Sequence, residues 1–374
     1  MVWVDAAGRH EGAERHGGNL AAAAARLGRS PRRLLDASAS LVPFGPPWAL
    51  RRALLRAVFT PALRSYPDRG WADLRRCLAR FHGLEPSHVL PGNGAAELFT
   101  WAARDAAATG VSLLPEPGFA DYARALACWD AAHRPLPLPL QWGPDLPQPF
   151  PASLTPPAQV LWLCNPHNPT GQLWSRASLE PLLERFALVV CDEAFLPLVP
   201  GGETQSLVPL VPRHPNLVVI RSLTKLLACA GLRLGYALGE AERLRRWAAW
   251  RDPWPVNGLA LAAAEQLLAD RAGLERWSRR VQAWVAREQP WLRQQLARWP
   301  QLSPMPSAAN FLLVRGEASL VPLREALERR HGILVRDCRS FVGLGELWLR
   351  IGLQHRGGHR RLLSALAREL PPGG

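Results

Sequence analysis

The chain has 374 residues, of which 48% are hydrophobic and 20% are charged, as in an ordinary globular protein that can bury a sizeable core. It contains no apolar run long and clean enough to span a bilayer, and its start lacks an apolar stretch of signal-peptide length. We therefore expect a cytoplasmic protein with no membrane partner. The net charge of +14 is compatible with nucleic acid or with anionic small molecules, but the basic residues form no dense run and no nucleic-acid-binding motif. We expect a small anionic ligand and no nucleic acid.

The six cysteines are scattered and show no C-x-x-C spacing. This distribution favours buried, reduced thiols over disulfides, and we expect no metal site.

The first two thirds of the chain predict an α/β domain. Residues 94–110 follow a glycine turn and are expected to form a helix, whereas the proline-rich residues 133–157 are interpreted as an extended connection on the surface. Four near-continuously apolar runs are typical of strands buried on both faces of a sheet, and a helical stretch at 178–186 separates the first two: 159–164, 186–192, 216–222 and 233–239. This alternation predicts a mostly parallel sheet.

The last third differs in character. Residues 258–299 are helix-rich. They are followed by a strand, a helix and two further strands, at 310–315, 321–332, 333–338 and 347–353. This order predicts a small α+β domain that closes the chain.

Lys225 is the only lysine among the 45 lysine and arginine residues of the chain. Because arginine supplies the other basic side chains of this protein, a role as an ordinary solvated surface charge explains the single lysine poorly. A lysine amine forms a Schiff base with an aldehyde, which a guanidinium does not. Lys225 follows the predicted strand 216–222 at its carboxyl end, where ligands bind in open α/β sheets. With Ser222, Thr224 and Arg233 nearby, the segment suits an aldehyde that carries a phosphate, as in pyridoxal phosphate.

Three other segments fit the same cofactor, although each has a structural explanation when taken alone. Asp192 ends a strand in "VVCDEAF" and could face a protonated pyridine nitrogen, or could be an N-cap or part of a buried ion pair. "CNPHNPTG", at 164–171, is a rigid turn in which Asn168 offers an amide to a ring hydroxyl. "PGNGAAEL", at 91–98, opens a helix whose free N–H groups suit a phosphate.

The order and spelling of "NPHNPTG", "DEAF", "SLTK" and "GLRLGY" resemble the fold-type I pyridoxal phosphate enzymes, the aspartate aminotransferase superfamily, over about residues 16–356. The resemblance implies the α/β fold of these transferases. It implies a large cofactor domain with a mostly parallel sheet at 46–257 and a smaller α+β domain from 1–45 and 258–374. It also implies a homodimer with the site at the interface.

The resemblance also implies roles for individual residues. Lys225 matches the Schiff-base lysine and Asp192 the partner of the pyridinium nitrogen. Asn168 matches the residue that bonds the ring hydroxyl, Phe119 the aromatic residue stacked on the ring, and Tyr66 a tyrosine that reaches the phosphate in the neighbouring subunit. The remaining phosphate contacts fall on Ser222, Arg233 and the amides of Gly94 and Ala95. One position departs from many members, because Phe195 replaces a tyrosine that bonds the ring oxygen.

Three further segments resemble one branch of the superfamily, the L-threonine-O-3-phosphate decarboxylases of cobalamin biosynthesis. They are "RHGGNL" at 15–20, "LLDASASLVPFGPP" at 34–47 and "ILVRDCRSFVGLGELWLRIGL" at 333–353. This resemblance implies that His16, Gly17 and Arg336 bind a substrate phosphate, and that Arg350 and Asn168 bind the amino-acid end. Ser40 stands where the branch is asparagine-rich and supplies part of that polar contact.

The predicted function is the pyridoxal-phosphate-dependent decarboxylation of L-threonine O-3-phosphate. One alternative is a histidinol-phosphate-type aminotransferase, since orientation of the substrate decides between decarboxylation and transamination. A second, from another class, is a non-catalytic protein that senses pyridoxal phosphate or binds nucleic acid.

Overall fold

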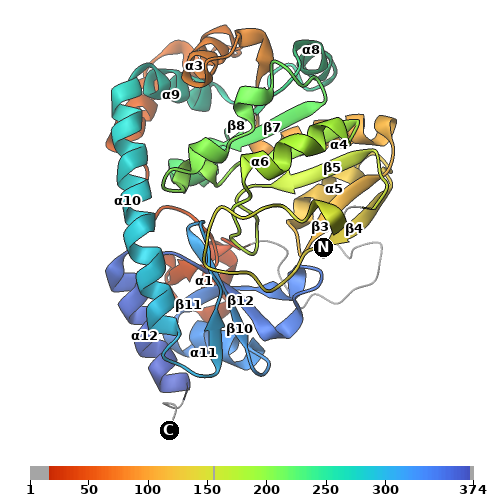
Figure 1. Ribbon diagram of the computed structural model, residues 1–374. Helices are drawn as coiled ribbons and strands as arrows, with labels where there is room; N and C mark the ends of the chain where they lie inside the picture. Colours follow the sequence, from red (N-terminus) through yellow and green to blue (C-terminus); the bar gives the residue numbers. More distant parts are fainter. Residues whose placement is uncertain (1–16, 155, 371–374) are drawn as a thin grey trace.

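A seven-stranded sheet forms the larger part of the protein, for which a computed structural model describes residues 17–154 and 156–370 (Figure 1). The strand order is β2-β8-β7-β6-β5-β3-β4. The strands are β2 (Val89–Gly92), β3 (Ser112–Glu116), β4 (His133–Pro137), β5 (Val160–Cys164), β6 (Leu188–Asp192), β7 (Leu217–Ser222) and β8 (Gly235–Leu238). Only β8 runs antiparallel to its neighbours, so the predicted mostly parallel sheet is confirmed.

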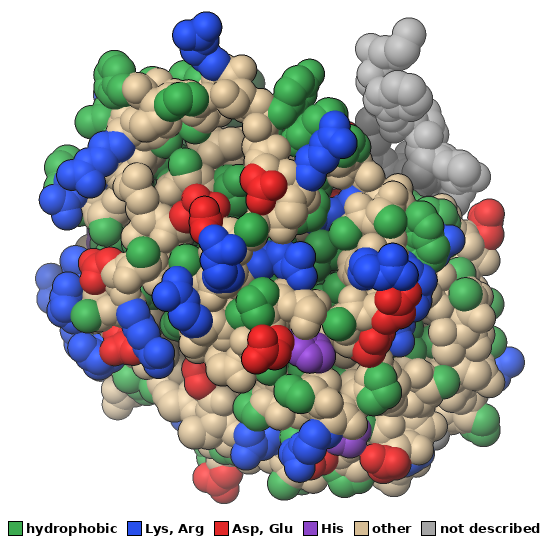
Figure 2. Space-filling view, turned by 90° about the horizontal axis from the view of Figure 1, so that it is seen from above, with side chains coloured by type: hydrophobic (Ala, Val, Ile, Leu, Met, Phe, Trp, Pro, Cys, Tyr) green, Lys and Arg blue, Asp and Glu red, His purple; other side chains and the backbone are tan. Residues whose placement is uncertain are grey.

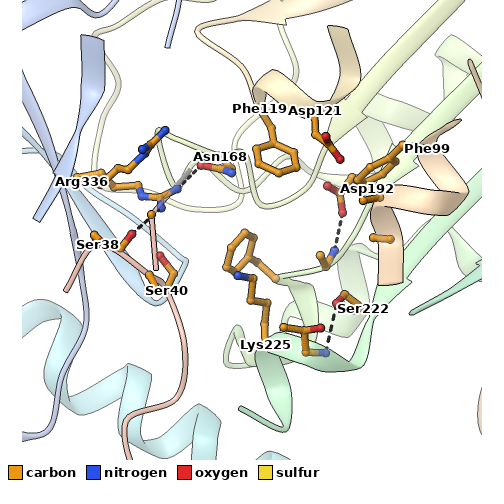
Figure 3. A pocket seen from close by; sticks show the side chains of 18 of the residues that line it. Ser38, Ser40, Phe99, Phe119, Asp121, Asn168, Asp192, Ser222, Lys225 and Arg336 are labelled. Atoms are coloured by element: carbon orange, nitrogen blue, oxygen red, sulfur yellow. Dashed lines mark hydrogen bonds between the residues drawn. The ribbon is translucent and has the colours of Figure 1, made fainter. Parts of the chain in front are cut away.

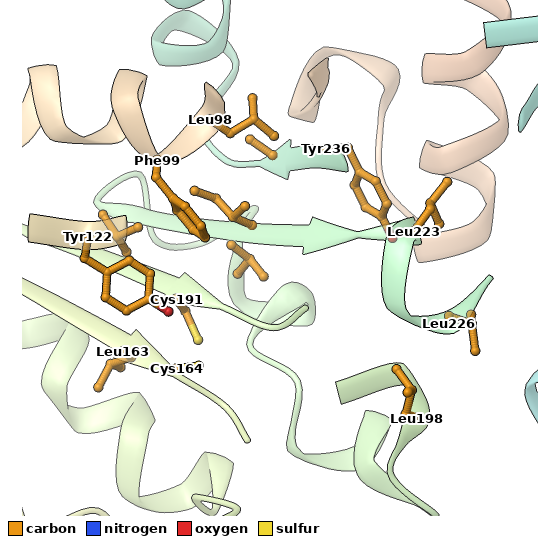
Figure 4. Packing of buried hydrophobic residues seen from close by; sticks show 14 of the residues in the cluster. Leu98, Phe99, Tyr122, Leu163, Cys164, Cys191, Leu198, Leu223, Leu226 and Tyr236 are labelled. Atoms are coloured by element: carbon orange, nitrogen blue, oxygen red, sulfur yellow. The ribbon is translucent and has the colours of Figure 1, made fainter. Parts of the chain in front are cut away.

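The central strands β5, β6 and β7 are buried along their whole length, as their apolar sequences predict. The helices α4 (Gly94–Thr109) and α5 (Ala120–Ala127) contribute Leu98, Phe99 and Tyr122 to the core that packs on these strands (Figure 4). Because β5, β6 and β7 are parallel and in register, their carboxyl ends lie at one edge of the sheet. Asp192 and Ser222 end two of them and are thereby brought to the same edge.

A second, five-stranded sheet has the order β1-β11-β12-β10-β9. Its strands are β1 (Leu35–Ala37), β9 (Leu302–Pro304), β10 (Phe311–Gly316), β11 (Ile333–Asp337) and β12 (Trp348–Gly352). Its helices include α1 (Leu20–Leu27), α11 (Val321–His331) and α12 (Arg356–Glu369). The parallel pairing of β1 with β11 joins a segment near the start of the chain to its last third. The division into domains at residues 45/46 and 257/258 stays a prediction.

The helix α10 (Arg271–Leu296) runs beside both sheets (Figure 1). It follows α9 (Gly258–Ala269), which packs against α2 (Trp48–Val58) and α3 (Ala72–His82) at the level of the larger sheet. The segment 138–150, which follows β4, reaches the smaller sheet, where the indole Nε1 of Trp142 donates to the carbonyl of Pro306 at 2.9 Å. These contacts link the two sheets.

Three expectations about local structure were wrong in part. The proline-rich residues 133–157 are not only a surface connection, because β4 pairs with β3; Pro135 and Pro137 are tolerated in β4 because it is an edge strand. The predicted helix at 178–186 is α-helical only in α6 (Arg176–Leu179) and continues as a 3-10 helix over Glu180–Glu184, where Pro181 lacks an N–H group. Among the cysteines, which are all free, Cys128 is exposed.

No helix in the described parts of the chain has the length and apolar character needed to cross a membrane. On the face seen in Figure 2, basic side chains are interspersed with acidic ones and do not form one continuous basic band.

Candidate functional site

A cavity of about 210 Å³ lies between the two sheets. Ser38, Ser40 and Arg336 line it on one side. Asp192 and Ser222, at strand ends of the larger sheet, and Phe119, at the start of α5, line the other; Lys225 and Asn168 project between them (Figure 3). Sequence segments more than 300 residues apart therefore contribute to one site, as Ser38 and Arg350 do.

Lys225 lies on α7 (Leu223–Leu226), the short helix that begins directly after β7. Ser222 caps this helix, because its hydroxyl oxygen accepts a 3.2 Å hydrogen bond from the N–H group of Thr224. The Lys225 side chain is partly exposed toward the cavity, where its Nζ lies 5.5 Å from the centroid of the Phe195 ring. Loss of solvation, and then the positive charge of Arg350, lower the pKa of Lys225 to about 8. A fraction of this amine is therefore neutral and nucleophilic near neutral pH.

Asp192 is the last residue of β6 and is buried. Its Oδ2 accepts a hydrogen bond of 2.7 Å from the phenol of Tyr122, and its Oδ1 accepts one of 2.9 Å from the N–H group of Ala194. Burial raises the pKa of Asp192 to about 6, although both hydrogen bonds act in the opposite direction. A cationic ring nitrogen would lower this pKa again by supplying a counter-charge.

An anion cradle lies at the first turn of α4. Gly94 has φ of +75°, and a Cβ at this position would come within 2.4 Å of Nη2 of Arg233. The guanidinium of Arg233 therefore lies against the glycine backbone at the positive end of a 16-residue helix. Ala95, Ser222 and Arg233 line the cavity itself. The donors and charges suit a phosphate group.

Two arginines form the opposite wall. Arg336 on β11 and Arg350 on β12 are direct cross-strand partners, and both are buried. Arg350 donates to Oδ1 of Asn168 and, at 3.3 Å, to the carbonyl of Ser38, while Arg336 donates at 2.6 Å to the hydroxyl of Ser340. Burial, and then the charge of Arg336, lower the pKa of Arg350 to about 10. This arrangement can bind an anionic substrate next to Lys225.

The structure brings most of the predicted site residues together. Those that line the cavity are Gly17, Ser40, Ala95, Phe119, Asn168, Asp192, Ser222, Lys225, Arg233, Arg336 and Arg350. Gly94 borders it through its contact with Arg233. Tyr66 lies elsewhere, with 78% of its surface exposed and its ring stacked on Trp254. His16 lies outside the described residues.

Some residues of the site were missed in the sequence. Tyr122, the hydrogen-bond donor to Asp192, follows Phe119 by three residues, and that helical spacing was a usable signal. Ser38, Phe341 and Asp121 also line the cavity. The first two lie in the segments 34–47 and 333–353, whose resemblance to the decarboxylases was a usable signal, whereas no pattern marks Asp121. The hydroxyl of Ser40 is buried without a hydrogen-bond partner in the described structure, so it can bond a ligand. No group of His, Cys, Asp or Glu side chains suited to a metal ion exists in residues 17–154 and 156–370.

These features define a class of enzyme. Pyridoxal 5'-phosphate fits three features of the site. They are a nucleophilic lysine directly after a strand, a buried aspartate at the end of the adjacent strand, and donors for a phosphate group at the start of a helix. The contact between Gly94 and Arg233 is the most specific evidence that the residues fit the cofactor phosphate, because any side chain at position 94 would clash with the guanidinium of Arg233.

The chain belongs to the aminotransferase class I and II family, whose profile matches residues 34–366. This family has the type I fold of pyridoxal-phosphate-dependent enzymes, and the cofactor is pyridoxal 5'-phosphate. The predicted fold and cofactor are thus confirmed.

Relatives within the family include two kinds of enzyme. The threonine-phosphate decarboxylase of Salmonella typhimurium is 36% identical over 364 residues, which cover 94% of this chain and 95% of that protein. Histidinol-phosphate aminotransferase 1 of Mannheimia succiniciproducens is 29% identical, with 88% and 87% covered.

The solved structures divide in the same way. The L-threonine-O-3-phosphate decarboxylase of Porphyromonas gingivalis superimposes with a TM-score of 0.77 at 25% identity, covering 90% of this chain and 99% of that one. The histidinol-phosphate aminotransferase of Sinorhizobium meliloti in complex with pyridoxal-5'-phosphate gives 0.79 at 23%, covering 93% of each. The resemblance to the decarboxylases is confirmed, and histidinol-phosphate aminotransferases are close as well.

Proposed function

We propose that this protein decarboxylates L-threonine O-3-phosphate to (R)-1-aminopropan-2-ol O-2-phosphate and CO2, in cobalamin biosynthesis. The observation that carries the proposal is the cross-strand pairing of Arg336 with Arg350 in the wall of the cavity that holds Lys225. Two adjacent buried guanidinium groups repel each other, and an anionic ligand relieves that repulsion. The proposed substrate has two anionic groups, a carboxylate and a phosphate. The similarity to the threonine-phosphate decarboxylase of Salmonella typhimurium supports the same choice.

The cofactor contacts follow from the predicted roles. Lys225 holds the aldehyde carbon, Asp192 the ring nitrogen, Asn168 the ring hydroxyl and Phe119 the ring face. The phosphate binds Ser222, Arg233, the amides of Gly94 and Ala95, and Tyr66 of a neighbouring subunit. The support for these assignments is that all of them except Gly94 and Tyr66 line one cavity.

On the substrate side, Arg350 and Asn168 bind the carboxylate end, where they already contact each other. Arg336, Gly17, Ser40 and His16 serve the phosphate end. A guanidinium fork suits each anion because it donates two parallel hydrogen bonds.

The residues of the chain decide which bond at the substrate Cα breaks. When bound, the cofactor supplies an electron sink for the pair of electrons that this bond leaves on Cα. Arg350 and Arg336 fix the two ends of the substrate and so determine which Cα bond is aligned for cleavage. If the bond to the carboxylate is aligned, CO2 leaves and Cα takes up one proton. Lys225 can deliver that proton because its pKa of about 8 keeps the ammonium form populated at neutral pH.

A histidinol-phosphate-type aminotransferase is the second candidate. The similarity to histidinol-phosphate aminotransferase 1 of Mannheimia succiniciproducens favours it, and the same arginines could bind a phosphate and a 2-oxo acid carboxylate. Transamination requires the Cα–H bond to be aligned instead, which the same fold permits. Phe195 and the segment at Gly17 argue mildly for the decarboxylase.

One substrate comparison tests the proposal. Purified holoenzyme is given threonine phosphate, and CO2 release is measured; separately, it is given histidinol phosphate with 2-oxoglutarate, and glutamate formation is measured. We expect CO2 release with no need for a 2-oxo acid. Efficient glutamate formation with no release of CO2 would refute the decarboxylase proposal. Lys225→Ala should abolish either reaction while still binding the cofactor.

We also infer a cytoplasmic homodimer that binds neither nucleic acid nor membrane. Exposed large apolar side chains support the dimer, because they gather on α2 and the segment that follows it: Trp48, Leu55, Val58, Phe59, Leu63 and Tyr66.

A further inference from the structure

Phenylalanine rings lie against the arginines of the cavity. The Cζ of Arg350 is 4.9 Å from the centroid of the Phe311 ring and 5.8 Å from that of Phe341. The Cζ of Arg336 is 5.3 Å from the same Phe341 ring. Phe341 therefore serves both guanidinium groups, and it lines the cavity together with them.

The same relationship extends to Lys225. Its Nζ lies over the Phe195 ring, and Phe195 packs edge-to-face on Phe311 with 5.3 Å between the ring centroids. A series of contacts therefore runs along the wall of the cavity from Lys225 through Phe195, Phe311, Arg350 and Phe341 to Arg336. The distances from cation to ring in this series are within the range of about 6 Å in which a cation is attracted to the face of an aromatic ring.

Buried arginines elsewhere in the described protein are neutralised by carboxylates. Arg221 pairs with Glu193 at 2.6 Å, and Arg251 pairs with Glu97 at 3.3 Å. Arg350 has no carboxylate within ion-pair distance in the described residues, and its buried Nε lacks a hydrogen-bond partner there. Arg251 combines its carboxylate with a ring, since its Cζ is 4.3 Å from the centroid of the Trp71 ring, whereas Arg350 contacts rings without a carboxylate in the part of the chain that the structure describes.

This difference has a consequence for ligand binding. A carboxylate partner would occupy the N–H donors of a guanidinium and would compete with an anionic ligand for them. A ring face stabilises the positive charge without accepting those in-plane hydrogen bonds. Arg350 donates to the neutral oxygens of Asn168 and Ser38, but no bound carboxylate from the described chain competes with an anionic ligand for its guanidinium.

We propose that Phe341, supported by Phe311, is a specificity-determining residue, whose ring stabilises the charges of Arg350 and Arg336 that bind a ligand with two anionic groups. The inference deepens the proposed function and rests on it for the identity of the substrate. The anion binding that it predicts does not depend on which bond of that substrate breaks.

The test compares Phe341→Leu with Phe341→Tyr in the holoenzyme. Inorganic phosphate is the probe, since the bound cofactor already fills the other phosphate site, and its affinity is measured by titration calorimetry. We expect Phe341→Leu to weaken phosphate binding by about three- to tenfold, the range of one ring contact to a partly desolvated cation. Phe341→Tyr retains a ring face and should bind phosphate as the wild type does. The Michaelis constant for threonine phosphate should rise in Phe341→Leu by a larger factor than kcat falls.

Phe150→Leu is the matched control, because Phe150 is a buried phenylalanine that packs on Trp174 and does not line the cavity. It should leave phosphate affinity unchanged. If Phe341→Leu does not fold, Phe341→Met supplies a second side chain without a ring. Equal phosphate affinity in the wild type and the ring-free variant would overturn the inference, as would an equal loss in Phe341→Tyr. Absence of decarboxylation would defeat the proposed function instead and would leave the phosphate comparison intact.

Discussion

The phenol of Tyr122 donates a hydrogen bond of 2.7 Å to Oδ2 of Asp192, deep in the cavity wall. The two residues are 70 positions apart in sequence and meet because Tyr122 packs on Trp162 of β5, the strand next to β6. With Ala194 bonded to Oδ1, both carboxylate oxygens are fixed in direction. Burial still dominates, so the pKa of Asp192 rises to about 6 despite these donors. The carboxylate is thus oriented in advance but depends on a cation for full ionisation.

This relationship predicts how the stability of the cofactor-free protein changes with pH. The pKa of Asp192 is raised from 3.8 to about 6 on folding, so between these values the folded state binds a proton that the unfolded state has lost. The free energy of unfolding therefore falls as pH rises through this window. In Asp192→Asn this contribution to the pH dependence of the free energy of unfolding is absent, because an amide does not titrate. We expect the wild type to lose about 2 kcal/mol relative to Asp192→Asn between pH 4 and pH 7, measured by urea denaturation.

Tyr122→Phe provides the control for this prediction. It removes a donor that lowers the pKa of Asp192, so the window in which stability falls should extend to higher pH. A wild-type profile parallel to that of Asp192→Asn at all pH values would show that Asp192 ionises normally in the folded protein.

The lowered pKa of Lys225 predicts how the rate of cofactor attachment depends on pH. Because desolvation and Arg350 lower its pKa to about 8, the rate of covalent attachment of pyridoxal phosphate to the cofactor-free protein should rise with pH and level off near 8. Arg350→Leu removes a positive charge and should shift the plateau to higher pH. Absorbance changes give the rate, and borohydride reduction followed by peptide mass mapping gives the position. With a single lysine in the chain, Lys225→Arg is a clean control, and a plateau near pH 10 in the wild type would contradict the prediction.

The grouping of Lys225, Ser222 and Asp192 around one cavity could be predicted because its signals are local. Lys225, Ser222 and Asp192 stand at the ends of apolar strands, and parallel neighbouring strands bring their carboxyl ends to one edge. The long helix at Gly94 and the strands β5 to β7 were recognisable for the same reason.

Other features depend on contacts that no local pattern encodes. The strand β1 has three residues, too few for a periodic signal, and its pairing with β11 is set by the folded chain. The prolines of β4 concealed an edge strand. The contact of Arg350 with Asn168 spans 182 positions, so only the family resemblance could suggest that they share a site.

We predict that adding a side chain at Gly94 selectively lowers the affinity for the cofactor. In Gly94→Ala the new Cβ would lie 2.4 Å from Nη2 of Arg233, so the guanidinium must move out of the cradle. We expect affinity for pyridoxal phosphate to fall at least about tenfold, as for the loss of a charge-assisted contact. Gly83→Ala is the matched control, since Gly83 has φ of +68° but nothing within 4 Å of its added Cβ. Both variants should lose about 1 kcal/mol of stability from backbone strain, measured by thermal unfolding, and only Gly94→Ala should lose cofactor. Equal affinities in the two would contradict the cradle.

The position of Tyr66 leads us to predict that a second subunit completes the cofactor site. The residue is 78% exposed and lies outside the cavity, where it lines a surface hollow together with Leu63. If it reaches the cofactor phosphate of the partner, Tyr66→Phe should weaken cofactor binding by about tenfold or more, since it removes a hydrogen bond to a charged group.

Mixing two variants separates this arrangement from a site within one subunit. In a heterodimer of Tyr66→Phe and Lys225→Ala, one site combines the intact Lys225 of the first chain with the intact Tyr66 of the second, and the other site lacks both. Refolding Tyr66→Phe with an excess of Lys225→Ala should therefore restore wild-type cofactor affinity at the sites that retain Lys225. If Tyr66 instead binds the cofactor phosphate of its own subunit, the site that retains Lys225 would still lack the phenol, and its cofactor affinity would not be restored. A mixture with the affinity of Tyr66→Phe alone, or a protein that sediments as a monomer, would exclude the shared site.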